Sequence, residues 1–172
     1  MSLQIGQKAP DFSMEAVTPD GEFETISLED YKGKWLVLFF YPLDFTFVCP
    51  TEIRGFSTNY DKFNELNAEI LGASTDSVYS HKAWMEDGLG DVKFPLLADF
   101  TKELSEQYNV LVPEKGFALR GTFIIDPEGT LRSVVVNDES VGRSVDETLR
   151  TLQALQTGKN TPCGWVPGQE TL

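Results

Sequence analysis

The stretch WLVLFFYPLDFTFVCPTE, residues 35–52, contains a change from strand to helix around which the rest of the chain can be arranged. Residues 35–41 form a continuous apolar run that ends at Pro42, and such a run predicts a strand covered on both faces in an α/β sheet. Further along, apolar residues recur at helical spacing, which predicts an amphipathic helix. These apolar residues are Ile53, Phe56, Tyr60, Phe63 and Leu66.

Cys49 is predicted to lie at the cap of this helix. Pro50 then occupies the first helical position, where its missing N–H costs nothing, and Glu52 places a carboxylate in the first turn. A thiolate at the cap faces unsatisfied backbone N–H groups and the positive end of the helix dipole. The sulfur of Cys49 is therefore expected to be nucleophilic at neutral pH.

The remaining patterns predict one α/β domain, residues 1–158, followed by an extended or mobile C-terminal arm, residues 159–172. An N-terminal hairpin is expected around the turn 18–21, and a βαβ unit is expected over residues 35–75. Further strands are predicted at 94–97, 122–125 and 131–136. Further helices are predicted at 80–87, 101–108 and 144–157. A central mixed sheet flanked by helices is the expected layout.

Composition limits the partners and the compartment. The chain has 172 residues, 41% of them apolar, and a formal net charge of -13, which argues against nucleic acid or an anionic membrane as a partner. No apolar run approaches the roughly 18 residues needed to span a bilayer, and the N-terminal sequence lacks the features of a signal peptide. We therefore expect a cytoplasmic protein.

Cysteine and histidine are scarce, because the chain has only Cys49, Cys163 and one histidine, His81. A zinc site of three or four Cys/His ligands would need almost every candidate, so no metal is expected. His81 lies in a polar stretch and is expected to be an ordinary surface residue rather than the base of a Cys–His pair. Arg120 is the candidate cation for Cys49, since it stands beside an apolar strand where an unpaired guanidinium would be costly.

The motif Pro42-x-x-x-Thr46-x-x-Cys49 resembles the peroxidatic motif of the peroxiredoxins, thiol peroxidases with a thioredoxin-like fold. FPLLAD at 94–99, LRGTFIIDPEG at 119–129 and Cys163-Gly164-Trp165 are similar to further motifs of the typical two-cysteine branch. That branch includes the small subunit of bacterial alkyl hydroperoxide reductase. The resemblance extends from about residue 5 to residue 165.

The resemblance implies a role for each site residue. Cys49 would attack the peroxide and Cys163 would resolve the resulting sulfenic acid as a disulfide, through an arm that crosses to a neighbouring subunit. Thr46 would accept a hydrogen bond near the sulfur and donate one to peroxide, and Arg120 would stabilise the reacting atoms. The ring of Pro42 would shield the thiolate. Supporting roles fall to Glu52, which would orient Arg120, and to Trp84, which is expected to pack near the site.

The resemblance also implies that hydrogen peroxide and organic hydroperoxides are substrates, that no cofactor is needed, and that thioredoxin or a dedicated flavoprotein disulfide reductase recycles the enzyme. A homodimer is implied, with assembly into a decamer left open. Two other functions remain as alternatives. A thiol-disulfide oxidoreductase normally has a Cys-x-x-Cys pair, whereas residue 52 here is Glu, and a redox-controlled holdase or sensor would show little turnover.

Overall fold

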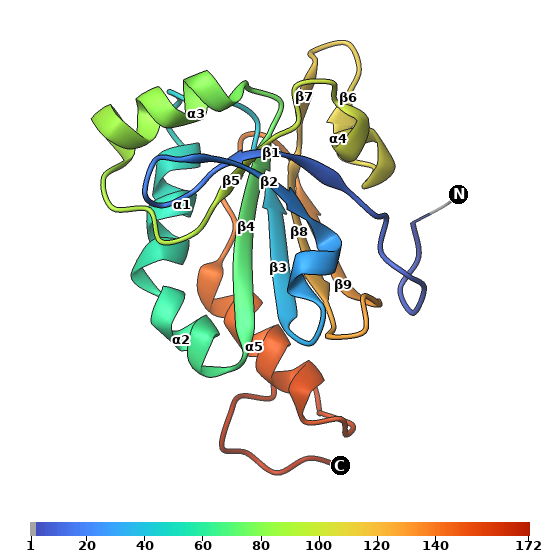
Figure 1. Cartoon of the computed structure of the whole chain (residues 1–172). Coiled ribbons are helices and arrows are strands. Elements are labelled where there is room, and N and C mark those ends of the chain that lie inside the picture. Colours follow the sequence, from blue (N-terminus) through green and yellow to red (C-terminus); the bar gives the residue numbers. More distant parts are fainter. Residues whose placement is uncertain (1–2) are drawn as a thin grey trace.

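The computed structural model describes residues 3–172, so the first two residues of the expected domain lie outside the described part of the chain. A seven-stranded sheet forms the centre, and helices lie on both of its faces (Figure 1). The strands are β1 Ser13–Val17, β2 Phe23–Ser27, β3 Trp35–Phe40, β4 Ala68–Ser74, β5 Leu96–Ala98, β6 Leu111–Val112, β7 Phe117–Ala118, β8 Arg120–Ile125 and β9 Leu131–Asn137. The helices are η1 Leu28–Tyr31, α1 Cys49–Thr58, α2 Tyr60–Glu65, α3 Val78–Trp84, η2 Met85–Leu89, α4 Glu103–Gln107 and α5 Val145–Gln156.

The large sheet is mixed, as expected, and its strand order is β2-β1-β5-β4-β3-β8-β9. Strands β3, β4 and β5 are parallel to one another, whereas β8 pairs antiparallel with β3 and β9 antiparallel with β8. The predicted N-terminal hairpin is present, because β1 and β2 pair antiparallel and β1 joins the sheet beside β5. The predicted βαβ unit is also confirmed, since β3 and β4 are parallel and α1 and α2 lie between them in the chain.

Alternation along β3 divides the core between the two faces of the sheet. Leu36, Leu38 and Phe40 belong to the cluster that includes residues of α4, whereas Val37 and Phe39 belong to the cluster that includes residues of α1, α2 and α5. Both groups are almost completely buried, which explains why this strand is apolar throughout. The C-terminal end of β3 leads into the loop that precedes Cys49.

The structure departs from the predicted elements at several points. The helix after Cys49 is interrupted at Asn59 and continues as α2, because Asn59 has φ -98° and ψ 6°. Arg120 lies within β8 rather than before it, and the short β6–β7 pair was not predicted. The helix predicted at 80–87 begins earlier, at Val78, and ends in the wider turn η2, where Asp87 and Gly88 have non-helical backbone angles.

The C-terminal arm contains neither helix nor strand, but it curls back rather than extending. The backbone N–H of Leu172 donates to the carbonyl oxygen of Asn160 at 2.8 Å, and Trp165 is only 4% exposed. In Figure 1 the arm lies beyond the C-terminal end of α5, at the bottom of the view. Among the described residues, no helix is both long enough and apolar enough to cross a membrane.

Candidate active site

Cys49 is the first residue of α1 and is fully buried. The prediction that it caps the helix is wrong by one position, because Val48 already has helical backbone angles and serves as the N-cap, and Pro50 follows at the second position. The sulfur nevertheless lies at the N-terminal end of the helix, where the dipole favours a negative charge. It belongs to the same buried cluster as Ile53 and Trp84.

Arg120 reaches Cys49 across the sheet. Its Nη1 atom lies 3.3 Å from the Sγ atom of Cys49 and 2.5 Å from the Oε1 atom of Glu52. Its Nε atom donates to the backbone carbonyl of Glu139 at 2.7 Å, so the guanidinium is held from three directions. Arg120 is 4% exposed. Its guanidinium contacts the buried thiol of Cys49, as predicted from the sequence. Glu52 is also in contact with Arg120, as the resemblance implied.

Arg143 is a second buried arginine of the site, which the sequence analysis missed. Its backbone N–H and its Nε atom donate to the Oε2 atom of Glu52 at 2.9 and 2.7 Å, and Nη1 donates to the carbonyl oxygen of Gly121 at 2.8 Å. Nη2 also contacts the carbonyl oxygen of Phe40. Burial lowers the pKa of Arg143, while the neighbouring Glu52 carboxylate acts in the opposite direction.

One signal in the sequence could have identified Arg143. It stands directly before Ser144, the N-cap of α5, and a cation at the N-terminus of a helix opposes the helix dipole. Its place is explained by Glu52, which accepts hydrogen bonds from both arginines.

Ser144 accepts a hydrogen bond from the backbone N–H of Glu147, but the Glu147 carboxylate binds Arg150, so only half of the predicted capping box forms.

Pro42 and Thr46 lie in the loop between β3 and α1. Pro42 is buried, whereas Thr46 is partly exposed. The hydroxyl of Thr46 donates to the carbonyl oxygen of Leu43 at 2.7 Å. Its proton is therefore engaged within the loop, and donation to a peroxide, as implied by the resemblance, requires the hydroxyl to rotate away from this carbonyl. The oxygen keeps its lone pairs as acceptors.

Trp84 packs beside this loop, as expected. Its ring centroid lies 5.7 Å from that of Phe45 and 6.1 Å from that of Tyr41. Phe45 has a φ angle of 58°, which is uncommon for a large side chain, and the packing against Trp84 helps to hold the loop in that conformation. Trp84 thus supports the segment that leads into Cys49.

The prediction that His81 is a surface residue is wrong. His81 is fully buried: Nδ1 lies 2.7 Å from the Oδ2 atom of Asp44, and Nε2 lies 2.9 Å from the carbonyl oxygen of Leu97. Burial lowers the pKa of His81, but the hydrogen bond and charge of Asp44 outweigh it, and the net direction is upward. The polar neighbours in sequence gave no sign of this, because the helix buries only one of its faces.

Asp44, Asp76 and His81 are the group of potential metal ligands found among residues 3–172, with candidate atoms within 4.8 Å of one another. Both ring nitrogens of His81 already face oxygen acceptors. Asp76 accepts from the backbone N–H of Asp44 at 2.9 Å and from the hydroxyl of Ser74 at 2.6 Å. Because these atoms satisfy one another, the cluster is explained as a hydrogen-bond network that holds the loop after β3.

Cys163 does not lie beside Cys49. It is exposed and lines a depression together with Leu155 and Gly158 at the C-terminal end of α5. Cys49 and Glu52 lie at the opposite end of α5, where Glu52 binds Arg143. Since α5 has 12 residues, the two ends are about 18 Å apart. Arg150 holds the arm in place by donating from Nη1 to the carbonyl oxygen of Trp165 at 2.8 Å.

A buried cysteine at a helix N-terminus, in contact with a buried arginine and next to a mixed α/β sheet, defines a thiol-based redox enzyme. Comparison with known proteins identifies its family. The sequence pattern of the AhpC/TSA family matches residues 5–134. The chain is 54% identical over 175 residues to the putative peroxiredoxin YkuU of Bacillus subtilis, covering 98% of this chain and 97% of that protein. It is also 54% identical over 178 residues to the chloroplastic 2-Cys peroxiredoxin BAS1 of Hordeum vulgare, covering 98% and 84% respectively.

Solved structures agree with the sequence comparisons. The reduced 2-Cys peroxiredoxin of Plasmodium vivax superposes with a TM-score of 0.95 at 41% identity, covering 98% of this chain and 92% of that one. AhpC of Enterococcus faecalis superposes with a TM-score of 0.86 at 43% identity, covering 89% and 92%. The chain therefore belongs to the AhpC/TSA family, has the thioredoxin-like peroxiredoxin fold, and is a thiol-dependent peroxidase.

Proposed function

We propose that Cys49 is the peroxidatic residue and that it reduces hydrogen peroxide and organic hydroperoxides. The observation that carries this assignment is the 3.3 Å contact between Arg120 Nη1 and Cys49 Sγ at the start of α1. A guanidinium and a helix N-terminus both favour the thiolate, and both remain in position to stabilise the charge that spreads over the peroxide oxygens during the reaction. Glu52, held by both arginines, keeps Arg120 directed at the sulfur.

The first step transfers one oxygen atom. The Cys49 thiolate attacks the nearer peroxide oxygen, the O–O bond breaks, and the leaving oxygen takes a proton and departs as water or an alcohol. Cys49 becomes a sulfenic acid, the first rung of cysteine oxidation. Thr46, after its hydroxyl turns from the carbonyl of Leu43, donates to the peroxide, and the buried Pro42 limits access of water.

Cys163 resolves the sulfenic acid. Its thiol attacks the sulfur of Cys49, water leaves, and a disulfide forms. A disulfide needs the two Cα atoms within about 7 Å, whereas the cysteines lie at opposite ends of α5. The arm of a second copy of the chain therefore supplies Cys163, and a two-fold homodimer forms two equivalent bridges.

Exposed apolar surface supports assembly of this kind. Strand β9 is the outer strand of the sheet, and its Val135 and Val136 are 49% and 41% exposed, which favours an edge contact between two subunits. Phe47 is 95% exposed and Phe45 is 59% exposed beside the active site, which favours a second contact through which dimers assemble into a decamer. Thioredoxin or a flavoprotein disulfide reductase then restores the dithiol by exchange.

Two cysteine variants test this proposal. Cys49→Ser is expected to abolish peroxide reduction, because it removes the nucleophile. Cys163→Ser is expected to consume about one equivalent of peroxide and to accumulate the sulfenic acid. On a non-reducing denaturing gel, peroxide-treated wild type should migrate as a linked dimer, and Cys163→Ser should not.

The outcomes separate the parts of the proposal. Full turnover by both variants with thioredoxin would contradict the assignment of the two cysteines. A monomeric band with both thiols consumed would instead contradict the exchange of arms between subunits. Steady turnover by the wild type also distinguishes a peroxidase from a redox-controlled holdase or sensor.

A further inference from the structure

We propose that Arg54 is a positioning residue that holds α1 folded around Cys49 and thereby slows formation of the disulfide with Cys163. This inference rests on the proposed resolution by Cys163. Because Cys49 is fully buried and Cys163 is exposed on the arm, the first turn of α1 must open before the two sulfurs can meet. Any contact that exists only while α1 is packed in place therefore opposes resolution.

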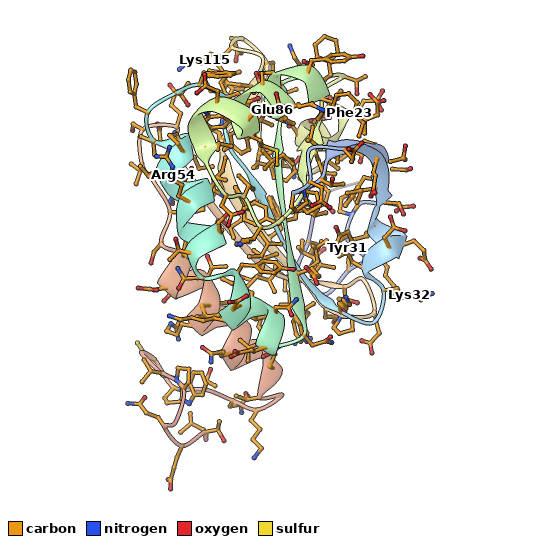
Figure 2. All side chains as sticks on the ribbon, turned by 60° about the vertical axis from the view of Figure 1, so that its left-hand side comes forward. Phe23, Tyr31, Lys32, Arg54, Glu86 and Lys115 are labelled. Carbon is orange, nitrogen blue, oxygen red and sulfur yellow. The ribbon has the colours of Figure 1, made fainter. Side chains whose placement is uncertain are left out.

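Arg54 makes such a contact from the second turn of α1. Its Nε atom donates to the carbonyl oxygen of Leu89 at 3.1 Å, and its Nη2 atom donates to the carbonyl oxygen of Gly88. These carbonyls belong to the wide turn η2 that ends α3, and terminal helix carbonyls lack partners within their own helix. Arg54 thus caps one helix from another, and Figure 2 shows its side chain on α1, on the side next to the end of α3.

The turn η2, to which Arg54 donates, also contacts the loop that precedes Cys49. Gly88 lies against Trp84 so closely that an added Cβ would be 2.9 Å from the Trp84 ring, and Gly88 has a φ angle of 143°. Trp84 in turn packs on Phe45, with ring centroids 5.7 Å apart. The chain before Cys49 and the helix after it are therefore both fastened to residues 84–89.

A second contact continues the attachment along α1. The backbone N–H of Lys93 donates to the Ser57 hydroxyl at 3.3 Å, so the segment after η2 follows the same side of the helix. Leu89 is 3% exposed and belongs to the core cluster that contains Cys49. Among residues 3–172, no carboxylate lies within ion-pair distance of Arg54, so its polar contacts are the two carbonyls and not a surface salt bridge.

The consequence is a competition at the sulfenic acid. While α1 stays folded, the sulfenic acid can react with a second hydroperoxide: its sulfur takes one oxygen, the O–O bond breaks, an alcohol or water leaves, and a sulfinic acid remains. Once α1 opens, Cys163 instead attacks the sulfur and releases water. Arg54 favours the first outcome, because it stabilises the folded helix.

The test measures both reactions in Arg54→Ala and in Arg54→Lys, which keeps the charge but cannot bind two carbonyls in the same way. Stopped-flow tryptophan fluorescence follows the oxidation of Cys49 and then disulfide formation, and intact mass after a peroxide pulse measures the sulfinic acid. Arg54→Ala is expected to form the disulfide about fivefold faster, the effect of losing the hydrogen bonds of an exposed charged donor. The sulfinic fraction should fall, and Arg54→Lys should lie between the two.

Lys62→Ala is the matched control, since Lys62 is an exposed cation of α2 whose side chain makes no hydrogen bond with residues 3–172. It should leave both reactions unchanged. The rate of the first oxidation should stay within about twofold of wild type in every variant, because Arg54 does not touch the sulfur. Faster disulfide formation with an unchanged rate of the first oxidation distinguishes a positioning role from a general loss of folding, which would slow the first oxidation as well.

Equal disulfide rates and equal sulfinic fractions in wild type and both Arg54 variants would overturn the inference. So would a parallel loss of the first oxidation step in Arg54→Lys. A wild-type protein that forms no Cys49–Cys163 disulfide would contradict the proposed resolution itself, and the two failures can therefore be told apart.

Discussion

Replacing Arg120 by alanine isolates the contribution of one buried charge to the reaction of Cys49. The Nη1 atom lies 3.3 Å from the sulfur, and the centre of the guanidinium charge lies about 4.5 Å away. At an effective dielectric constant of about 20, opposite charges at that distance attract by about 4 kcal/mol. Loss of a preorganised donor typically costs about 2.7–4 kcal/mol in activation free energy, so we expect the peroxide reaction to slow by about 100- to 1000-fold.

The fold should suffer less than the reaction. Removing one member of a buried ion pair costs about 3–5 kcal/mol when the remaining charge is uncompensated. In Arg120→Ala, Glu52 keeps the backbone N–H and Nε atom of Arg143, so the free energy of unfolding should fall by only about 2 kcal/mol. Stopped-flow measurement of the second-order rate constant with hydrogen peroxide gives the first quantity, and urea unfolding of the reduced protein gives the second.

Arg132→Ala is the control, since Arg132 is 38% exposed and pairs with Asp126 away from Cys49. Its rate constant should equal that of the wild type. A folded Arg120→Ala protein that reacts with peroxide within about threefold of wild type would refute the electrostatic account, because the calculated attraction is far larger than such a change.

Three further changes probe the surroundings of the site. Arg143→Ala should lower the free energy of unfolding by about 2–3 kcal/mol in urea titrations and also slow the peroxide reaction, because Glu52 loses one of its two guanidinium partners and the carbonyl oxygens of Gly121 and Phe40 lose the donors of this side chain. The pKa of His81 is raised above its ordinary value of 6.5, so its contribution is complete below that value and is lost as pH rises through the folded pKa. Unfolding measured across this range should show the loss in wild type but not in His81→Gln. Gly72→Ala should lower the melting temperature, at a cost of about 1–3 kcal/mol, because its Cβ would lie 2.8 Å from a core leucine.

Local pattern was sufficient to predict the order and type of most elements. The apolar run before Pro42, the turn at 126–129 and the Ser144 cap each involve residues close in sequence, and each appears in the structure where it was predicted. Boundaries were less accurate, since the break at Asn59 and the start of α1 at Cys49 depend on how the helices pack rather than on the residues around them.

The two errors at the site have a common cause. His81 was predicted to be exposed and Arg143 was not considered, yet both are buried and bonded to carboxylates that lie 37 and 91 residues away in the chain. Burial of a charge is tolerated only where a partner is present. The partners, Asp44 and Glu52, come from other segments of the chain. The residues next to His81 and Arg143 in the sequence therefore do not indicate that these carboxylates will lie beside them.

Periodicity, turn residues and helix-terminal chemistry act over a few residues, and they were therefore enough to predict a mixed α/β protein with a cysteine at the start of a helix. The contacts between distant segments could be seen only in the folded chain: Arg120 reaches the sulfur of Cys49, Glu52 joins Arg120 to Arg143, and Cys163 lies at the far end of α5. The same is true of the hydrogen bond from Arg54 to the turn after α3. These contacts join distant segments, and they exist only once the sheet has brought its strands and helices into register, since their energies depend on distances of a few ångströms and on the exclusion of water.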